Sequence, residues 1–255
     1  MGDWIALTVD LEPDWGVRGT RALREITPVF LRFLEERGIA ATFFIVSDLL
    51  ETSSGLVAAI AERNEVGSHG CSHRLLGSLC DGEARRELKE SRQRLEDVAG
   101  AVRGFRAPFF QRRPAFFRML RKAGYSYDAS LGSVLPGPVN GRLARLGCPF
   151  RRGDLYEFPT AAMWGGMMPL SLTWLRILAP ASLAQLPGSA SLLYLHLHEF
   201  LSAETAACLP ARTRWLLTRN CGRTAWRILD EALEALGGRF TTCGSILDAT
   251  RDDSA

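Results

Sequence analysis

Hydrophobic and polar positions follow two different periods along the first part of the chain. "WIALTVD" at 4–10 and "AATFFIVS" at 40–47 are short runs rich in β-branched and aromatic residues, which is typical of buried strands. Between them, residues 21–38 carry apolar side chains at helical spacing and end on Gly38. The chain therefore begins with a predicted β-α-β unit.

The same alternation continues to the end of the chain. Asp81 can cap the start of the longest predicted helix and Gly100 can end it. Further helices are expected at 54–64, 81–100, 114–124 and 223–238, and further strands leading into Gly67 and at 102–107, 125–130, 155–160 and 191–198. Strands that alternate with helices in this way predict a parallel sheet, and about seven βα units favour a closed barrel over an open sheet.

Composition and charge indicate what kind of domain this is and which partners it has. With 47% hydrophobic and 23% charged residues, the chain is typical of a globular protein, and we expect a single domain over residues 1–245. Residues 132–153 are expected to form an irregular loop and residues 246–255 a disordered tail. The net charge of +3 comes without long basic runs, so the sequence predicts no nucleic-acid partner.

Cysteine usage and the first residues indicate a compartment. The six cysteines form no CxxC pair, which indicates reduced thiols and not a disulfide framework. "MGDWIALTVD" has no basic start and no long apolar core of a signal peptide. We therefore expect a cytoplasmic protein.

All four histidines are confined to two short stretches, and both lie near predicted strand ends. His69 and His73 occur in "EVGSHGCSH", and His196 and His198 occur in "LYLHLHE". Polar residues at the other strand ends are Asp10, Glu12, Asp14, Arg106 and Asp128. Because the carboxyl ends of barrel strands meet on one face, we expect these side chains to form one site.

The spacing of these residues predicts a metal site. Two histidines four apart on a helical turn, together with one carboxylate, form a three-ligand zinc site that keeps one position open. Asp10 and Glu12 are separated by one residue, so they lie on one side of a strand; one can bind metal while the other accepts a proton. Asp14 is close enough to compete with Glu12 for the metal. Cys71 is expected to be a bystander.

Six segments in a consistent order over about residues 4–200 resemble a known family. They are "LTVDLE", "TFFIVS", "EVGSHGCSH", "GFRAPFF", "YSYDAS" and "LYLHLHE". This order resembles the polysaccharide deacetylases of carbohydrate esterase family 4, the chitooligosaccharide deacetylase homology domain, in the branch whose first motif reads Asp-x-Asp or Asp-x-Glu. The resemblance implies a distorted (β/α)7 barrel and a divalent metal, zinc. It also implies removal of an acetyl or formyl group from an amino sugar.

The resemblance also assigns roles. It makes Asp10 the catalytic base, Arg106 the residue that orients this base, and His196 the general acid, which Asp128 holds and charges. Glu12, His69 and His73 become the metal ligands. His198 has no counterpart in the motif. Phe109 stands where many members have tyrosine, and the fourth motif lacks its usual tryptophan.

Two other functions fit parts of the same pattern. A metal-free amidohydrolase of the allantoinase-like branch would not need both His69 and His73, so the intact pair argues against it. A carbohydrate-binding relative without catalysis would not need Asp10, Arg106, Asp128 and His196 together.

A final segment bears on the substrate. Residues 163–197 are largely apolar, but Pro169, Pro180 and Pro187 leave no stretch of the roughly 20 residues that a spanning helix needs. "LSLTWLRIL" indicates either a buried helix or an interfacial contact, and the Arg- and Trp-rich residues 211–227 suit a headgroup boundary. Two interpretations of this segment therefore remain. In one, it is a buried core with a solvated face. In the other, the protein makes peripheral contact with the inner membrane face and acts on a lipid-linked sugar or a glycoconjugate.

Overall fold

The computed structural model describes residues 4–17, 19–113, 115–132, 138–139, 142–143, 149–163, 168–186, 192–237 and 239–252. Its centre is a curled sheet whose strands run in the order β12-β1-β2-β3-β4-β5-β9-β8. The parallel strands are β1 (Trp4–Leu11), β2 (Thr42–Ile45), β3 (Glu65–Ser68), β4 (Gly104–Phe105), β5 (Tyr127–Asp128), β9 (Leu155–Glu157) and β12 (Leu192–His196). β8 (Phe150–Arg152) pairs antiparallel with β9, and β13 (Arg239–Thr241) pairs parallel with the start of β1.

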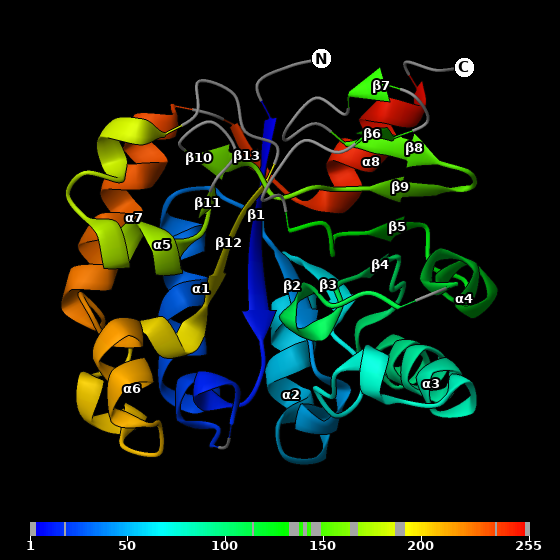
Figure 1. The fold of residues 1–255 in the computed structure, drawn as a ribbon, viewed down its shortest axis with the longest axis horizontal. Coiled ribbons are helices and arrows are strands. Elements are labelled where there is room, and N and C mark those ends of the chain that lie inside the picture. The colour runs from blue at the N-terminus through cyan, green and yellow to red at the C-terminus, as the bar shows by residue number, and fades with distance from the viewer. Residues whose placement is uncertain are drawn as a thin grey trace.

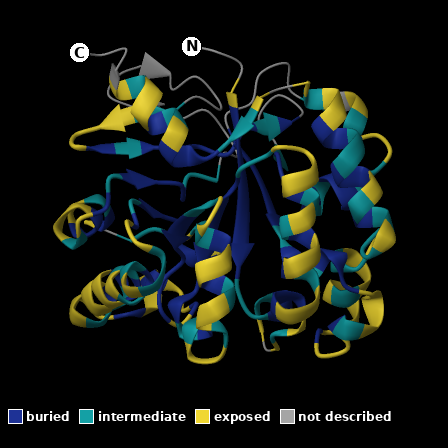
Figure 2. Cartoon of the chain, turned by 180° about the vertical axis from the view of Figure 1, so that it is seen from behind, coloured by how far each residue is buried: buried dark blue, intermediate teal, exposed yellow. Residues whose placement is uncertain are grey.

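Helices cover the outside of this sheet (Figure 1). They are α1 (Thr27–Glu36), α2 (Leu50–Ala61), α3 (Asp81–Ala99), α4 (Phe116–Ala123), α5 (Leu172–Leu178), α6 (Ala211–Leu217), α7 (Arg223–Leu236) and α8 (Cys243–Asp252). The central strands are buried, whereas β8 and the outward faces of the helices are largely exposed (Figure 2). Two further strand pairs stand apart from the main sheet, β6 (Pro138–Val139) with β7 (Arg142–Leu143) and β10 (Ala162–Met163) with β11 (Met168–Pro169). The predicted barrel of βα units is confirmed.

The barrel is distorted where it closes. The segment after β9 reaches β12 through two backbone hydrogen bonds, from Ala161 N to the Leu192 carbonyl at 3.3 Å and from Tyr194 N to the Leu170 carbonyl at 3.4 Å. These bonds replace a regular strand pairing between β8 and β12, which are the two ends of the hydrogen-bonded order. The polar face at the carboxyl ends of the strands is therefore built around β1 and its neighbours.

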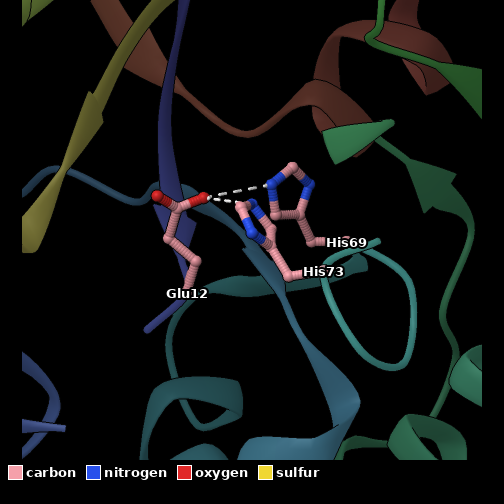
Figure 3. A group of neighbouring side chains, drawn as sticks. All are labelled: Glu12, His69 and His73. Carbon is pink, nitrogen blue, oxygen red and sulfur yellow. Dashed lines mark ion pairs between the residues drawn. The ribbon is translucent and has the colours of Figure 1, made fainter. Parts of the chain in front are cut away.

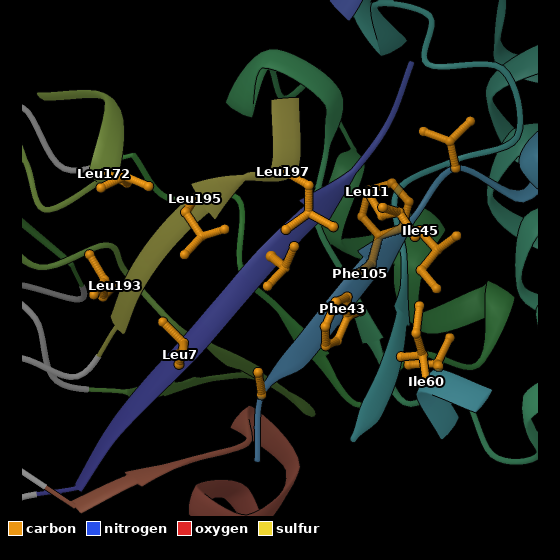
Figure 4. Close-up of a cluster of buried hydrophobic side chains, with 14 of the residues drawn as sticks. Leu7, Leu11, Phe43, Ile45, Ile60, Phe105, Leu172, Leu193, Leu195 and Leu197 are labelled. Atoms are coloured by element: carbon orange, nitrogen blue, oxygen red, sulfur yellow. The ribbon is translucent and has the colours of Figure 1, made fainter. Parts of the chain in front are cut away.

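Alternation along the strands sorts side chains between two faces. Leu7, Phe43 and Leu195 point outward into the core that the helices cover (Figure 4), and burying each such side chain contributes about 1.5–3 kcal/mol. Their strand neighbours point inward and form a smaller cluster that includes Ala6, Phe44, Tyr127, Leu192 and Tyr194. Because the side-chain period of a strand is two, Asp10 and His196 also face inward. They are register partners on β1 and β12.

Glycine permits this interior packing at β4. A Cβ on Gly104 would lie 2.0 Å from the Tyr127 ring, so only glycine lets that ring cross the strand. The next residue but one, Arg106, then enters the interior at the end of β4.

Three local predictions are corrected by the structure. Cys80, and not Asp81, caps α3: the Glu83 N–H donates to Cys80 Sγ at 3.5 Å, and the Cys80 N–H donates to Glu83 Oε2 at 2.9 Å. The domain does not end at 245, because α8 continues to Asp252 with Leu247 fully buried. Residues 253–255 of the predicted tail lie outside the described residues. Of the predicted loop 132–153, residues 133–137, 140–141 and 144–148 also lie outside them, and 150–152 form β8.

The apolar segment around α5 is part of the core. Leu172, Leu175 and Ile177 are buried, which is the buried-helix alternative for "LSLTWLRIL". Among the helices that the structure describes, none is long and apolar enough to cross a membrane.

Candidate active site

The end of β1 and the loop after β3 bring three metal-binding side chains together. Glu12 directly follows β1, and its Oε2 lies 2.6 Å from His73 Nε2 and 3.5 Å from His69 Nε2 (Figure 3). One ligand atom from each residue lies within 4.8 Å of the others. The predicted cluster of Glu12, His69 and His73 is therefore formed.

The histidines converge for a different reason from the one predicted. Residues 69–73 are not helical but follow β3 as a loop, in which His73 has a positive φ of 57°. Glu87 on α3 holds this loop, since its Oε2 accepts the Cys71 N–H at 2.7 Å and the Ser72 N–H at 3.3 Å. The Cys71 thiol points to the Glu87 carbonyl at 3.5 Å, so it stands aside as expected.

The donor set fits a divalent cation. The Nδ1–H of His69 donates to the Arg106 carbonyl at 2.8 Å, which leaves Nε2 free to face Glu12. His73 Nε2 is buried and has no hydrogen-bond partner among the described residues. It lies 2.6 Å from Glu12 Oε2, but without hydrogen-bond geometry. Burial would raise the pKa of Glu12, but His196, His69 and His73 lower this pKa well below its usual value. Two imidazoles and an ionised carboxylate form the set that zinc takes with one open position.

Asp14 does not compete for this site. Its carboxylate accepts the backbone N–H groups of Arg21 at 2.7 Å and Ala22 at 3.0 Å. These groups belong to the start of the helical segment before α1, so Asp14 acts as a helix cap. The donor cluster contains Glu12, and Asp14 lies outside it.

A buried arginine orients Asp10. Arg106 is fully buried, and its Nη1 donates to Asp10 Oδ1 at 2.6 Å. The guanidinium is fixed by bonds to the Thr8 hydroxyl and the Ala129 carbonyl, both at 3.0 Å, and lies over the Phe44 ring at 4.3 Å. The contact predicted between Arg106 and Asp10 is therefore present, and it leaves Asp10 Oδ2 facing His196.

His196 lies between two carboxylates. Its Nε2 is 3.9 Å from Asp10 Oδ2, and its Nδ1–H donates to Glu199 Oε1 at 3.2 Å. Burial lowers the pKa of His196, but Glu12, Glu199 and Asp10 together raise it to about 9. These carboxylates favour the protonated ring, which a general acid requires.

Asp128 does not hold His196, which corrects the prediction. Asp128 Oδ1 instead accepts the Ser130 hydroxyl at 2.5 Å, and Asp128 is the register partner of Glu157 on β9. Burial raises the pKa of Asp128 to about 6, and burial together with Asp128 raises the pKa of Glu157 well above its usual value. Asp128 therefore bonds Ser130 and lies beside another buried acid, and it makes no contact with the His196 ring.

Glu199 holds His196 in the way that the family resemblance implied for Asp128. It lies in the turn Leu197–Phe200 that follows β12, and its Oε1 also accepts the His196 N–H at 3.0 Å. The signal was present in "HLHE", because a glutamate three residues after a turn-starting residue can reach back to that residue's backbone.

Aromatic groups form the walls of the site. His198 stacks on His196 with ring centroids 5.0 Å apart and contacts Trp15 at 4.7 Å. Burial and the charge of His196 lower the pKa of His198 to about 4, so His198 is neutral. Phe109 lies on the other side with its ring centroid 4.8 Å from that of His73, and it is 58% exposed.

Residues 2–127, just under half of the chain, match the family model of polysaccharide deacetylases. This part of the chain matches the polysaccharide deacetylase family. A peptidoglycan-N-acetylglucosamine deacetylase from Bacillus cereus is 30% identical over 105 residues, which are 41% of this chain and 35% of the relative. The match to this curated relative thus spans about a third of its length.

Solved structures of this family share the fold. The peptidoglycan deacetylase PdaC from Bacillus subtilis superposes with a TM-score of 0.56 at 16% identity, over 98% of this chain and 93% of that one. A pseudoenzyme of carbohydrate esterase family 4 from Bacillus anthracis superposes with a TM-score of 0.55 at 13% identity, over 96% and 66%. The family's barrel therefore carries both enzymes and a pseudoenzyme.

Proposed function

We propose that this protein is a metal-dependent hydrolase that removes an acetyl or formyl group from the nitrogen of an amino sugar, with zinc as its metal. The observation that carries the proposal is the meeting of the Glu12–His69–His73 cluster with two acid–base groups, Asp10 and His196. The name of the B. cereus relative supports an N-acetylated sugar as substrate.

The side chains divide the reaction between them. A divalent cation held by Glu12, His69 and His73 would supply Lewis acidity at the acyl carbonyl and at the attacking water. Asp10, fixed by Arg106, accepts the proton of that water from one side. His196 donates the proton of its Nε2 to the departing amine from the other side, while Glu199 retains the proton on Nδ1.

The alternatives make different demands on the same residues. A metal-free amidohydrolase would not use the cluster that His69 and His73 form with Glu12. A non-catalytic sugar-binding relative would not need the two buried ion pairs, Asp10 with Arg106 and His196 with Glu199. Metal-dependent hydrolysis uses all of them.

The test is metal analysis of the purified protein together with an assay for acetate and formate release from N-acyl sugars. Asp10→Asn should retain zinc and lose most turnover, since an amide cannot accept the proton. Asp230→Asn is the control, because Asp230 pairs with Arg37 at the surface and lies outside the donor cluster. Protein that binds sugar but releases no acyl group would contradict hydrolysis, and full turnover without metal would contradict the role of zinc.

We also propose peripheral contact with the inner membrane face, through α6. Trp215 is 69% exposed, Leu216 is 37% exposed, and no residue of α6 is buried. Arg212 is exposed on the same helix, so α6 offers both apolar and cationic groups to an anionic surface. Such a location would suit a lipid-linked sugar or a glycoconjugate.

A further inference from the structure

Arg176 is a buried cation that no recognised motif explains. Among the residues that the structure describes, two arginines are fully buried, Arg106 and Arg176. Arg176 lies on α5, and its Nε donates to Glu199 Oε2 at 2.7 Å. Its other nitrogens donate to the carbonyls of Leu217 at 3.0 Å and Arg219 at 2.5 Å. The guanidinium thus joins α5, the end of α6 and the turn after β12.

Glu199 is held on its other side as well. Its Oε1 accepts the Thr173 hydroxyl at 3.0 Å, in addition to the N–H and the Nδ1–H of His196. Burial would raise the pKa of Glu199, but Arg176 and His196 lower it to about 2. The carboxylate is therefore ionised, and its orientation is set by two side chains of α5.

The arrangement mirrors the one at the base. Arg106 bonds one oxygen of Asp10 and leaves the other toward the site, and Arg176 bonds one oxygen of Glu199 and leaves the other toward His196. With Nδ1 bonded to Glu199, the free nitrogen of His196 is Nε2, which faces Asp10. Each acid–base group is thus supported by its own buried arginine.

We propose that Arg176 is a positioning residue for His196, and that it acts through Glu199. It keeps Glu199 ionised and turned toward Nδ1, which fixes the proton on Nδ1 and aims Nε2 at the leaving group. The role in turnover rests on the proposed function, whereas the hydrogen bond from Nδ1 to Glu199 can be measured without turnover.

The kinetic test is a double-mutant cycle of Arg176→Met and Glu199→Gln in zinc-loaded protein. Arg176→Met should lower kcat by about tenfold to a hundredfold with KM and zinc content unchanged, the scale known for residues that orient a ligand or catalytic group. Arg176→Lys should lose less. If Arg176 acts through Glu199, the double variant should be no slower than Glu199→Gln alone. Additive losses would overturn the proposal.

Arg92→Met is the matched control. Arg92 also donates to two backbone carbonyls, those of Val102 at 3.1 Å and Ala123 at 2.9 Å, and pairs with Glu96 at 2.8 Å. It lies on α3, away from His196, so it should affect stability without changing kcat. An equal fall in kcat for Arg92→Met would show a general structural effect and would refute positioning.

A second readout does not depend on turnover. The chain has four histidines, so the imidazole protons can be followed by ¹H–¹⁵N NMR and assigned with His196→Gln. The hydrogen-bonded Nδ1 proton of His196 should persist in the parent, in Arg176→Lys and in Arg92→Met, and should exchange rapidly in Arg176→Met. Persistence in Arg176→Met would overturn the proposal even if the protein proves inactive. Where Arg176→Met does not fold, the cycle with Arg176→Lys and Glu199→Gln gives the same decision.

Discussion

Replacing Glu199 with glutamine should destabilise the fold by about 3 kcal/mol at neutral pH. Burial opposes ionisation of Glu199, yet Arg176 and His196 lower its pKa from 4.5 to about 2. Since a tenfold change in an acid dissociation constant corresponds to about 1.4 kcal/mol, this difference amounts to about 3 kcal/mol. Leaving Arg176 buried without its carboxylate has a cost of the same size, about 3–5 kcal/mol.

The pH dependence follows from the sign of the shift. Because the pKa of Glu199 is lower in the folded protein, its contribution is fully present above pH 4.5 and is lost as the pH falls through about 2. Glutamine does not titrate, so the difference in stability between parent and variant should shrink over this range. Urea unfolding followed by tryptophan fluorescence, from about pH 7 down to about pH 3, measures the difference directly.

An exposed pair provides the control. Arg21 Nε lies 2.7 Å from Glu25 Oε1, the same separation as Arg176 Nε from Glu199 Oε2, but its side chains are 56% and 52% exposed. Glu25→Gln should change the free energy of unfolding by less than about 1 kcal/mol, because water screens the pair. Equal stability of Glu199→Gln and the parent at neutral pH, or a gap that stays constant with pH, would refute the reasoning.

Three further predictions concern the site and the surface. His73→Ala should strip the metal and abolish turnover, since two ligands hold zinc poorly, and full metal occupancy in this variant would contradict the centre. In steady-state assays, His196→Ala should lower kcat by about a hundredfold or more, and His198→Ala should lower it much less. A larger loss for His198→Ala would instead make His198 the general acid. Trp215→Ser should weaken sedimentation with anionic vesicles without changing the melting temperature, because Trp215 is exposed. Binding by the parent should fall as salt rises, at about 1 kcal/mol per screened arginine, and no binding at low salt would exclude the membrane contact.

Local periodicity was enough to predict the sheet and the inner face of the site. Asp10 lies inside because the apolar positions of β1 alternate, and the same period places His196 inside on β12. The glycine at 100 was enough to end α3. The carboxyl ends of parallel strands lie at the same edge of the sheet. The sequence could therefore also predict that Glu12, His69 and His73 would meet.

Which carboxylates and arginines support the acid–base groups was decided mainly by the tertiary structure, although "HLHE" carried a local signal for the contact between Glu199 and His196. Asp128 and Glu199 are both carboxylates near strand ends, but the register of β5 with β9 places Asp128 beside Glu157, and the turn after β12 places Glu199 beside His196. Arg176 appears in the sequence as a single charge in an apolar helix, and its role depends on where that helix packs. Strand period is a property of neighbouring residues, whereas Asp128 with Glu157 and Arg176 with Glu199 join segments that are far apart in the chain. Their contacts depend on register and loop path, which no local pattern encodes.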